Sequence, residues 1–180
     1  MVLWGTCVPS GAFLSVRGPA DLAERARDRR DPEAEKQATH VLDELLAIVE
    51  ATPLARPGLS VEDDPLWTAY RAVVAAETGR CRDSAGQALA WESAVSSCSA
   101  IGYRWYEAMA RWRWAQALLG EGATKSEVAR QLRQAHSAAL DMGAEPLAKE
   151  TESLARAARI NLADPRGQPC RPKGSQPWQC

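Results

Sequence analysis

Residues that favour β-strands are scarce in this chain of 180 residues. It contains one phenylalanine, three isoleucines and ten valines against 33 alanines. Aromatic and β-branched residues favour strands, whereas alanine has the highest helix propensity of all residues. The composition therefore predicts an all-α protein. The seven tryptophans are unusual in such a chain, and we expect them to fill gaps between helices lined by alanine.

Several sequence features with a known chemistry are also lacking. The chain has 22 Lys and Arg against 23 Asp and Glu, so it does not have the excess of positive charge typical of nucleic-acid-binding proteins. Neither G-x-x-x-x-G-K-S/T nor G-x-G-x-x-G occurs, so the backbone cradle for a nucleotide phosphate is missing. A nucleophile elbow is absent as well. We therefore predict that the chain is not an enzyme and takes no cofactor.

Cysteine and histidine occur in numbers and spacings that do not favour a metal site or a disulfide framework. There are only two histidines and no C-x-x-C pair, and the cysteine count is odd. The five cysteines are Cys7, Cys81, Cys98, Cys170 and Cys180. No apolar run approaches the roughly 20 residues that span a bilayer, and Met1 to Val16 lacks the basic start of a signal peptide. We expect a cytoplasmic protein with five free thiols and no membrane contact.

Proline and glycine divide the chain into three parts. Residues 1–18 are predicted to be irregular, and residues 19–163 form a helical domain interrupted by a loop at 52–63. The tail, 164–180, contains four prolines and two glycines and is predicted to be disordered. Within the domain, apolar residues at three- and four-residue steps predict seven helices. Their expected ranges are 19–30, 31–49, 64–79, 83–102, 103–119, 124–142 and 146–162.

Four glycines stand where helices are expected to end, and they share a common spacing. Gly79 and Gly120 are 41 residues apart, as are Gly102 and Gly143, and each suits the left-handed position of a helix C-cap. Four alanine pairs recur at the same offset: Ala69 and Ala110, Ala76 and Ala117, Ala88 and Ala129, and Ala94 and Ala135. The alternative is coincidence in an alanine-rich chain, which does not explain the glycines. The pattern predicts antiparallel helical hairpins stacked as a short right-handed α-solenoid like that of tetratricopeptide repeats.

The most distinctive stretch is residues 104–114, in which arginine alternates with aromatic residues. On a helix, Trp105, Met109 and Trp112 share one face, and a second apolar face adjoins it. We favour a central core helix with ion-paired arginines at its rim. The alternative is a groove that binds a peptide or a nucleobase by stacking and cation–π contact. Its lining residues would be Arg104, Trp105, Arg111, Trp112 and Trp114.

Two further candidates for chemistry have simpler interpretations. His136 lies in the middle of a predicted helix between alanines, and we interpret it as a packing or surface residue rather than a base or a metal ligand. The acidic run Glu62, Asp63 and Asp64 precedes Pro65. We expect this run to cap the following helix rather than to bind a cation.

An ordered string of short motifs carries a resemblance to a known family. It consists of Asp21–Arg27 (DLAERAR), Ala76–Arg80 (AExxR), Tyr106, Ala108, Arg111–Arg113 (RWR), Ala115–Leu119 (AQALL), Leu132–His136 (LRQAH), Met142–Ala144 (MGA), Pro146–Leu147 (PL) and Glu152–Ile160 (ExLARxARI). Together these motifs resemble the tetratricopeptide-like helical region of large actinobacterial LuxR-family transcriptional regulators. The resemblance covers about residues 19–163.

The resemblance implies a regulatory role. In that family the region lies between an ATPase module, sometimes preceded by a cyclase domain, and a C-terminal helix-turn-helix, and it is thought to bind partners or inducers and to control access between those modules. This sequence departs in having Gln116 where the family usually has Glu, and a Pro-rich tail instead of a helix-turn-helix after Leu162. The ATPase is missing as well. The simplest account is a truncated or frame-disrupted member without specific DNA binding of its own.

We therefore expect a non-catalytic helical scaffold that binds a protein segment or a small inducer. Two alternatives stay open at this point. One is a stand-alone module that binds a peptide or a small ligand through the helix containing residues 104–114. The other is an accessory subunit that completes an ATPase or a cyclase in trans.

Overall fold

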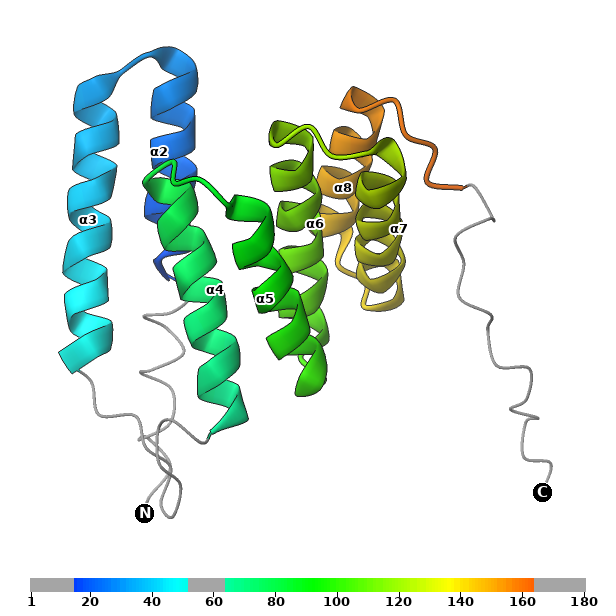
Figure 1. The fold of residues 1–180 in the computed structure, drawn as a ribbon, viewed down its shortest axis with the longest axis horizontal. Coiled ribbons are helices and arrows are strands. Elements are labelled where there is room, and N and C mark those ends of the chain that lie inside the picture. The colour runs from blue at the N-terminus through cyan, green and yellow to red at the C-terminus, as the bar shows by residue number, and fades with distance from the viewer. Residues whose placement is uncertain (1–14, 52–63, 164–180) are drawn as a thin grey trace.

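The computed structural model describes residues 15–51 and 64–163, and the predicted loop and tail lie outside these ranges (Figure 1). Within them the chain forms seven α-helices and no strand, which confirms the predicted all-α class. The helices are α2 (Arg17–Arg29), α3 (Pro32–Ala51), α4 (Pro65–Cys81), α5 (Gln87–Ala100), α6 (Arg104–Gly120), α7 (Lys125–Asp141) and α8 (Glu145–Ala157). α2 starts two residues before the expected position, and α8 ends five residues before the expected Leu162.

The helices pack as a row of hairpins with α3 at one end and α8 at the other (Figure 1). α2 pairs with α3, α4 with α5 and α6 with α7, while α5 also packs on α6 and α7 on α8. In addition, α2 packs on α4 and α6 packs on α8, so a helix also contacts the helix two positions further along the chain. The prediction of stacked helical hairpins is confirmed by this pattern. No helix in the described ranges is both long and apolar enough to cross a membrane.

Side-chain caps fix where three of the helices begin. Asp31 Oδ1 accepts from the backbone N–H of Ala34 at 3.1 Å at the start of α3. The carboxylate of Asp64 accepts a hydrogen bond from the backbone N–H of Leu66 at 2.9 Å, which confirms that Asp64 caps α4. Thr124 and Glu127 form a capping box at the start of α7. The expected start of α5 at residue 83 was wrong. The helix begins at Gln87, after the left-handed Gly86.

Six helices end in the same backbone arrangement. After each, an N–H donates to the carbonyl five residues earlier, and the residue before that N–H is left-handed, as in a Schellman motif. The left-handed residues are Arg30, Asp83, Gly102, Gly122, Gly143 and Arg159. Gly102 and Gly143 occupy the predicted positions, but Gly79 and Gly120 do not, because both are helical. Asp83 and Gly122 stand in their place, 39 residues apart, so the 41-residue spacing holds for one pair only.

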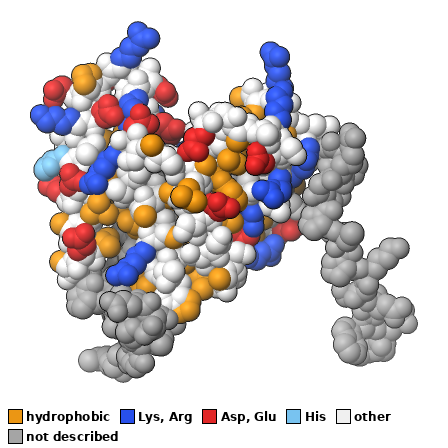
Figure 2. Space-filling model, in the orientation of Figure 1, with side chains coloured by type: hydrophobic (Ala, Val, Ile, Leu, Met, Phe, Trp, Pro, Cys, Tyr) orange, Lys and Arg blue, Asp and Glu red, His pale blue; other side chains and the backbone are white. Residues whose placement is uncertain are grey.

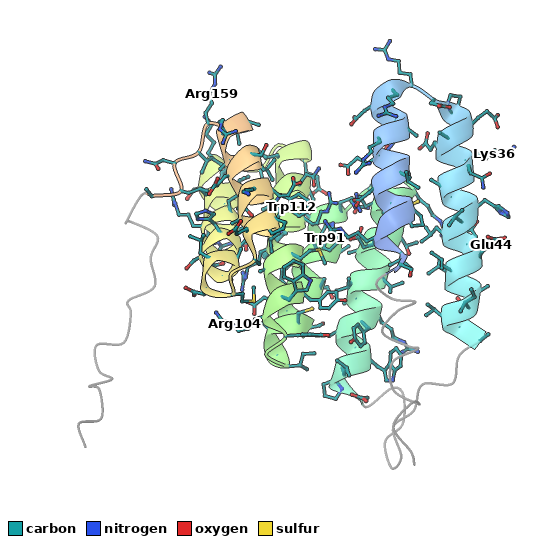
Figure 3. The ribbon with its side chains drawn as sticks, turned by 180° about the vertical axis from the view of Figure 1, so that it is seen from behind. Lys36, Glu44, Trp91, Arg104, Trp112 and Arg159 are labelled. Atoms are coloured by element: carbon teal, nitrogen blue, oxygen red, sulfur yellow. The ribbon has the colours of Figure 1, made fainter. Side chains whose placement is uncertain are left out.

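Three of the five tryptophans in the described ranges lie in the core. Trp91 is the largest fully buried side chain, and Trp67 and Trp112 are also buried. In Figure 3, Trp91 and Trp112 lie in the interior of the stack. Ala residues with no exposed surface lie beside them in the core, among them Ala94, Ala110, Ala115 and Ala135.

The three tyrosines of the chain form a second cluster. The rings of Tyr103 and Tyr106 lie 4.8 Å apart, and each lies about 6 Å from the ring of Tyr70. The hydroxyls of Tyr70 and Tyr103 are 3.3 Å apart and share a hydrogen bond. This bond and burial raise the pKa of Tyr103 to about 12. Aromatic packing therefore joins α4 to the start of α6.

Candidate functional site

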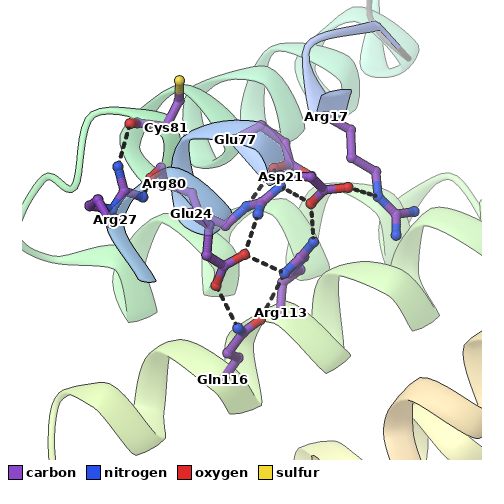
Figure 4. Close-up of polar contacts among 9 residues, drawn as sticks. All are labelled: Arg17, Asp21, Glu24, Arg27, Glu77, Arg80, Cys81, Arg113 and Gln116. Atoms are coloured by element: carbon purple, nitrogen blue, oxygen red, sulfur yellow. Dashed lines mark hydrogen bonds and ion pairs between the residues drawn. The ribbon is translucent and has the colours of Figure 1, made fainter. Parts of the chain in front are cut away.

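Three helices that are distant in sequence bring their charged side chains together in a network that we call the charged bridge (Figure 4). Its members are Asp21 and Glu24 from α2, Glu77 and Arg80 from α4, and Arg113 and Gln116 from α6. Each helix contributes two residues that are three positions apart, and this spacing places them on the same helix face. Each of α2, α4 and α6 therefore directs one pair of polar side chains toward the other two helices.

Asp21 and Glu24 of α2 each bind both guanidinium groups. Asp21 Oδ1 accepts from Arg80 Nη2 at 2.7 Å and from Arg113 Nη2 at 2.5 Å. Glu24 Oε2 accepts from Arg80 Nη1 at 2.8 Å and from Arg113 Nη1 at 3.4 Å. The two arginine side chains are 9% and 5% exposed, whereas Asp21 and Glu24 are 27% and 33% exposed, so these charge-assisted bonds join buried arginines to partly exposed carboxylates. α2 is thereby joined to α4 and α6 at once.

Glu77 of α4 and Gln116 of α6 complete the network. Glu77 is 1% exposed, and its Oε2 accepts from Arg80 Nε at 2.8 Å. Gln116 Oε1 accepts from Arg113 Nη1 at 2.8 Å, while its Nε2 donates to Glu24 Oε1 at 2.8 Å. A glutamate in place of Gln116 would set two carboxylates against each other. The amide thus suits this position, because it accepts on one side and donates on the other.

The electrostatics of the charged bridge follow from burial and from close charges. Burial opposes ionisation of Asp21, but the guanidinium groups of Arg80 and Arg113 outweigh it, and the pKa of Asp21 lies below its usual value. Burial also opposes the charge on Arg80, and Glu77 and Asp21 outweigh it, so the pKa of Arg80 is raised. For Arg113, burial and then repulsion by Arg80 lower the pKa.

Trp112 lies against this network. Its side chain is 7% exposed, and the guanidinium carbon of Arg113 lies 4.2 Å from the ring centroid. Arg17 lies 5.9 Å from the same centroid, and its Nε is 3.6 Å from Asp21 Oδ2. The indole thus contributes cation–π contacts to both arginines.

The five residues predicted to line a groove differ in their contacts and in their exposure. Arg104 is 3.6 Å from Asp141 on α7, with both side chains exposed. Arg111 binds Glu107 on its own helix and also reaches two glutamines of α7. Trp112 is buried beside the charged bridge, Trp114 is half-buried, and Trp105 is 39% exposed. The structure therefore divides the predicted set between the α7 side and the α2 side of α6.

Other sequence candidates have ordinary surroundings. His136 Nε2 lies 3.1 Å from Glu152 Oε1 on the partly exposed side of α7. Cys81 and Cys98 are free and buried, while the other three cysteines lie outside the described residues. Among residues 15–51 and 64–163, no group of His, Cys, Asp and Glu side chains is arranged to hold a metal ion.

The sequence prediction identified α6 as the important helix but missed the members of the charged bridge on α2 and α4. A signal was present in the i, i+3 spacing of Asp21 and Glu24 beside an alanine stripe, but it did not indicate a partner. These features define a stack of helical hairpins with a charged network across its first three hairpins. Comparison of the chain with models of protein families, with curated proteins and with solved structures found no match.

Proposed function

We propose that this protein is a non-catalytic helical interaction module that binds a protein segment on the face where α2, α4 and α6 meet. The observation that carries the proposal is the charged bridge, in which three hairpins direct charged side chains to one place. Stacked hairpins expose extended surfaces that are commonly used for binding.

The chemistry of the charged bridge fits recognition better than catalysis. Catalytic acids and bases need pKa values near the working pH. Asp21 instead has a lowered pKa, because its carboxylate is held by Arg80 and Arg113. Acidic and basic side chains are also interspersed on the face shown in Figure 2, without a broad basic patch for nucleic acid.

The regulatory part of the proposal rests on the motif string that resembles the helical region of LuxR-family regulators. We propose that the chain serves in the cytoplasm as the partner-binding region of such a regulator. The exposure of Trp105 beside Arg104 favours a second candidate function, a peptide or small-ligand module that uses the start of α6.

A peptide-library selection on the full chain tests this function. We expect helical peptides to be enriched, and hydrogen exchange to show protection in α4 and α6 when they bind. The matched control is Arg104→Gln, which changes an exposed residue on α6 outside the charged bridge. Protection confined to α5 and α7 would contradict the proposed binding face.

Two activity assays complete the test. We expect no ATP hydrolysis, because the sequence has no phosphate-binding loop. We also expect no sequence-dependent shift of duplex DNA at about 150 mM salt, where weak contacts from scattered charges are screened. Sequence-specific DNA binding at that salt concentration would contradict the proposal.

A further inference from the structure

The positively charged guanidinium groups of Arg80 and Arg113 take carboxylate counter-charges from α2. Glu77 supplies a carboxylate to Arg80 from the same helix. Arg113 has no such partner on α6, and among the described residues its hydrogen-bonded carboxylates both come from α2. A guanidinium that is only 5% exposed is costly to leave without a counter-charge. Removal of α2 would therefore leave Arg113 without a hydrogen-bonded carboxylate.

α2 itself is attached by small side chains and by charge. Its buried residues are Val16, Pro19, Ala20, Ala23 and Ala26. Alanine buries little apolar area per residue, so much of the selectivity of this contact comes from polar groups. These are Asp21 and Glu24, which bind the arginines, and Arg27, which donates to the backbone carbonyls of Arg80 and Cys81. α3 packs mainly on α2, so the hairpin is joined to the rest of the described stack chiefly through α2.

We propose that α2 is an internal ligand of a two-arginine site, and that the same site accepts a helix of a protein partner that carries two carboxylates three residues apart. This inference rests on the proposed function, because it specifies which protein segment binds and what covers the site beforehand. The sequence of α2 gives the chemistry of the partner. It has Asp21 and Glu24 three positions apart, with the small residues Ala20, Ala23 and Ala26 on the neighbouring positions.

The geometry explains why such a helix is selected. Each carboxylate of α2 accepts hydrogen bonds from both arginines, which requires two acids at the separation of one helical turn. Small residues at the intervening positions let the helix approach α4 closely, whereas large ones would hold it away. Since the site is occupied within the chain, a partner must displace α2, which makes the contact autoinhibitory.

A binding assay on the full-length chain tests the inference. The probe is a fluorescent synthetic peptide with the sequence of residues 16–30, measured by anisotropy with the wild type and with the double variant Asp21→Asn, Glu24→Gln. We expect the double variant to bind the peptide at least about tenfold more tightly than the wild type, because its own α2 no longer supplies charge. Binding should weaken between about 50 and 500 mM salt.

Controls separate this site from nonspecific attraction. Asp28→Asn removes an exposed carboxylate of the same helix and should leave binding as weak as in the wild type. A peptide with Asn and Gln at the two acidic positions should not bind the double variant. If the double variant unfolds cooperatively like the wild type but binds the peptide no more tightly, the internal-ligand inference is overturned.

Hydrogen exchange of the wild type gives a measurement that does not depend on the variant. We expect α2 to exchange through local opening, at a lower free energy than α6. Exchange of the α2 amides only through global unfolding would overturn the inference. This outcome differs from failure of the proposed function, which would appear as library peptides that do not bind the wild-type face at all.

Discussion

Asp21 and Arg113 are 92 positions apart in the sequence, and Asp21 Oδ1 accepts a hydrogen bond from Arg113 Nη2 at 2.5 Å. This contact joins the first hairpin of the stack to the third. Because Asp21 also binds Arg80 of the second hairpin, one carboxylate connects all three. The stability of the stack should therefore depend on this side chain more than on other surface acids.

Replacement of Asp21 by alanine should lower the free energy of unfolding by about 2–3 kcal/mol, somewhat less than the roughly 3–5 kcal/mol typical of a fully buried pair. The reason is that two guanidinium groups lose a shared acceptor while they stay buried. Urea unfolding followed by circular dichroism measures the change. Asp28→Ala, an exposed change on the same helix, should stay within about 0.5 kcal/mol. Equal losses in the two variants would show that the charged bridge contributes no particular stability.

Acid should weaken the charged bridge in a defined direction. The pKa of Asp21 is lower in the folded chain than in the unfolded one, so its contribution is complete above the unfolded value of about 3.9 and is lost as the pH falls through the folded value. We therefore expect the stability difference between the wild type and Asp21→Asn to shrink below about pH 4. Urea titrations at several pH values measure it, and a gap that widens in acid would contradict this assignment.

Trp112→Ala should cost about 3–5 kcal/mol of unfolding free energy, as is usual for a buried aromatic residue. The variant loses packing in the core together with the contacts to Arg17 and Arg113. The matched change is Trp105→Ala on the same helix, which removes a side chain that is 39% exposed and should cost less. A loss at Trp112 below about 1 kcal/mol would disagree with its burial.

Two helix ends should become more stable with glycine. Arg30 and Arg159 have φ values of 57° and 55°, a conformation that costs roughly 1 kcal/mol for a residue with a side chain. We expect Arg30→Gly and Arg159→Gly to raise stability by up to about 1 kcal/mol each. Gly143→Ala, at the same position of another helix, should lower stability by a similar amount. Thermal unfolding of the three variants tests the pattern, and a loss with both glycines would count against it.

The thiols of Cys81 and Cys98 should react slowly in the native protein. Burial raises the pKa of both, and burial together with the nearby Glu107 raises the pKa of Cys98 to about 11. Little of either thiol is then in the reactive thiolate form at pH 8. Labelling with a thiol reagent should modify two fewer cysteines in the native chain than in the denatured chain. The double variant Cys81→Ser, Cys98→Ser should show no such difference.

The helices were predictable because their signals are local. Alanine content, apolar spacing and the caps at Asp64 and Thr124 each act within one or two helical turns. The start of α5 was missed because Asp83 has a left-handed backbone conformation, which its residue type alone does not predict. The repeat spacing was overstated for a related reason, since Gly79 stays helical and leaves the left-handed position to Asp83.

The charged bridge was harder to predict because it depends on which helix faces meet. Periodicity placed Trp112 on an apolar face correctly, and Arg104 and Arg111 have ion-pair partners, but it gave no role to Arg113. Arg113 is buried, because Asp21 and Glu24 come to it from a helix at the other end of the sequence. Nothing in the spacing of α6 alone identifies that helix. The resemblance to LuxR-family regulators marked both segments but did not indicate that they touch.

The alanine stripe of α2 has one more consequence. Ala20, Ala23 and Ala26 have nearly the same shape, so a neighbouring helix would fit almost as well if α2 slid along its axis by one turn, about 5.4 Å. Such a seam does not encode a register by itself. Asp21 and Glu24 can both meet the two arginines in one position only, because a slip of one turn would put one carboxylate in the place of the other and leave the other without an arginine. The charged bridge therefore fixes the position of α2 along its axis, which the alanine stripe alone does not fix.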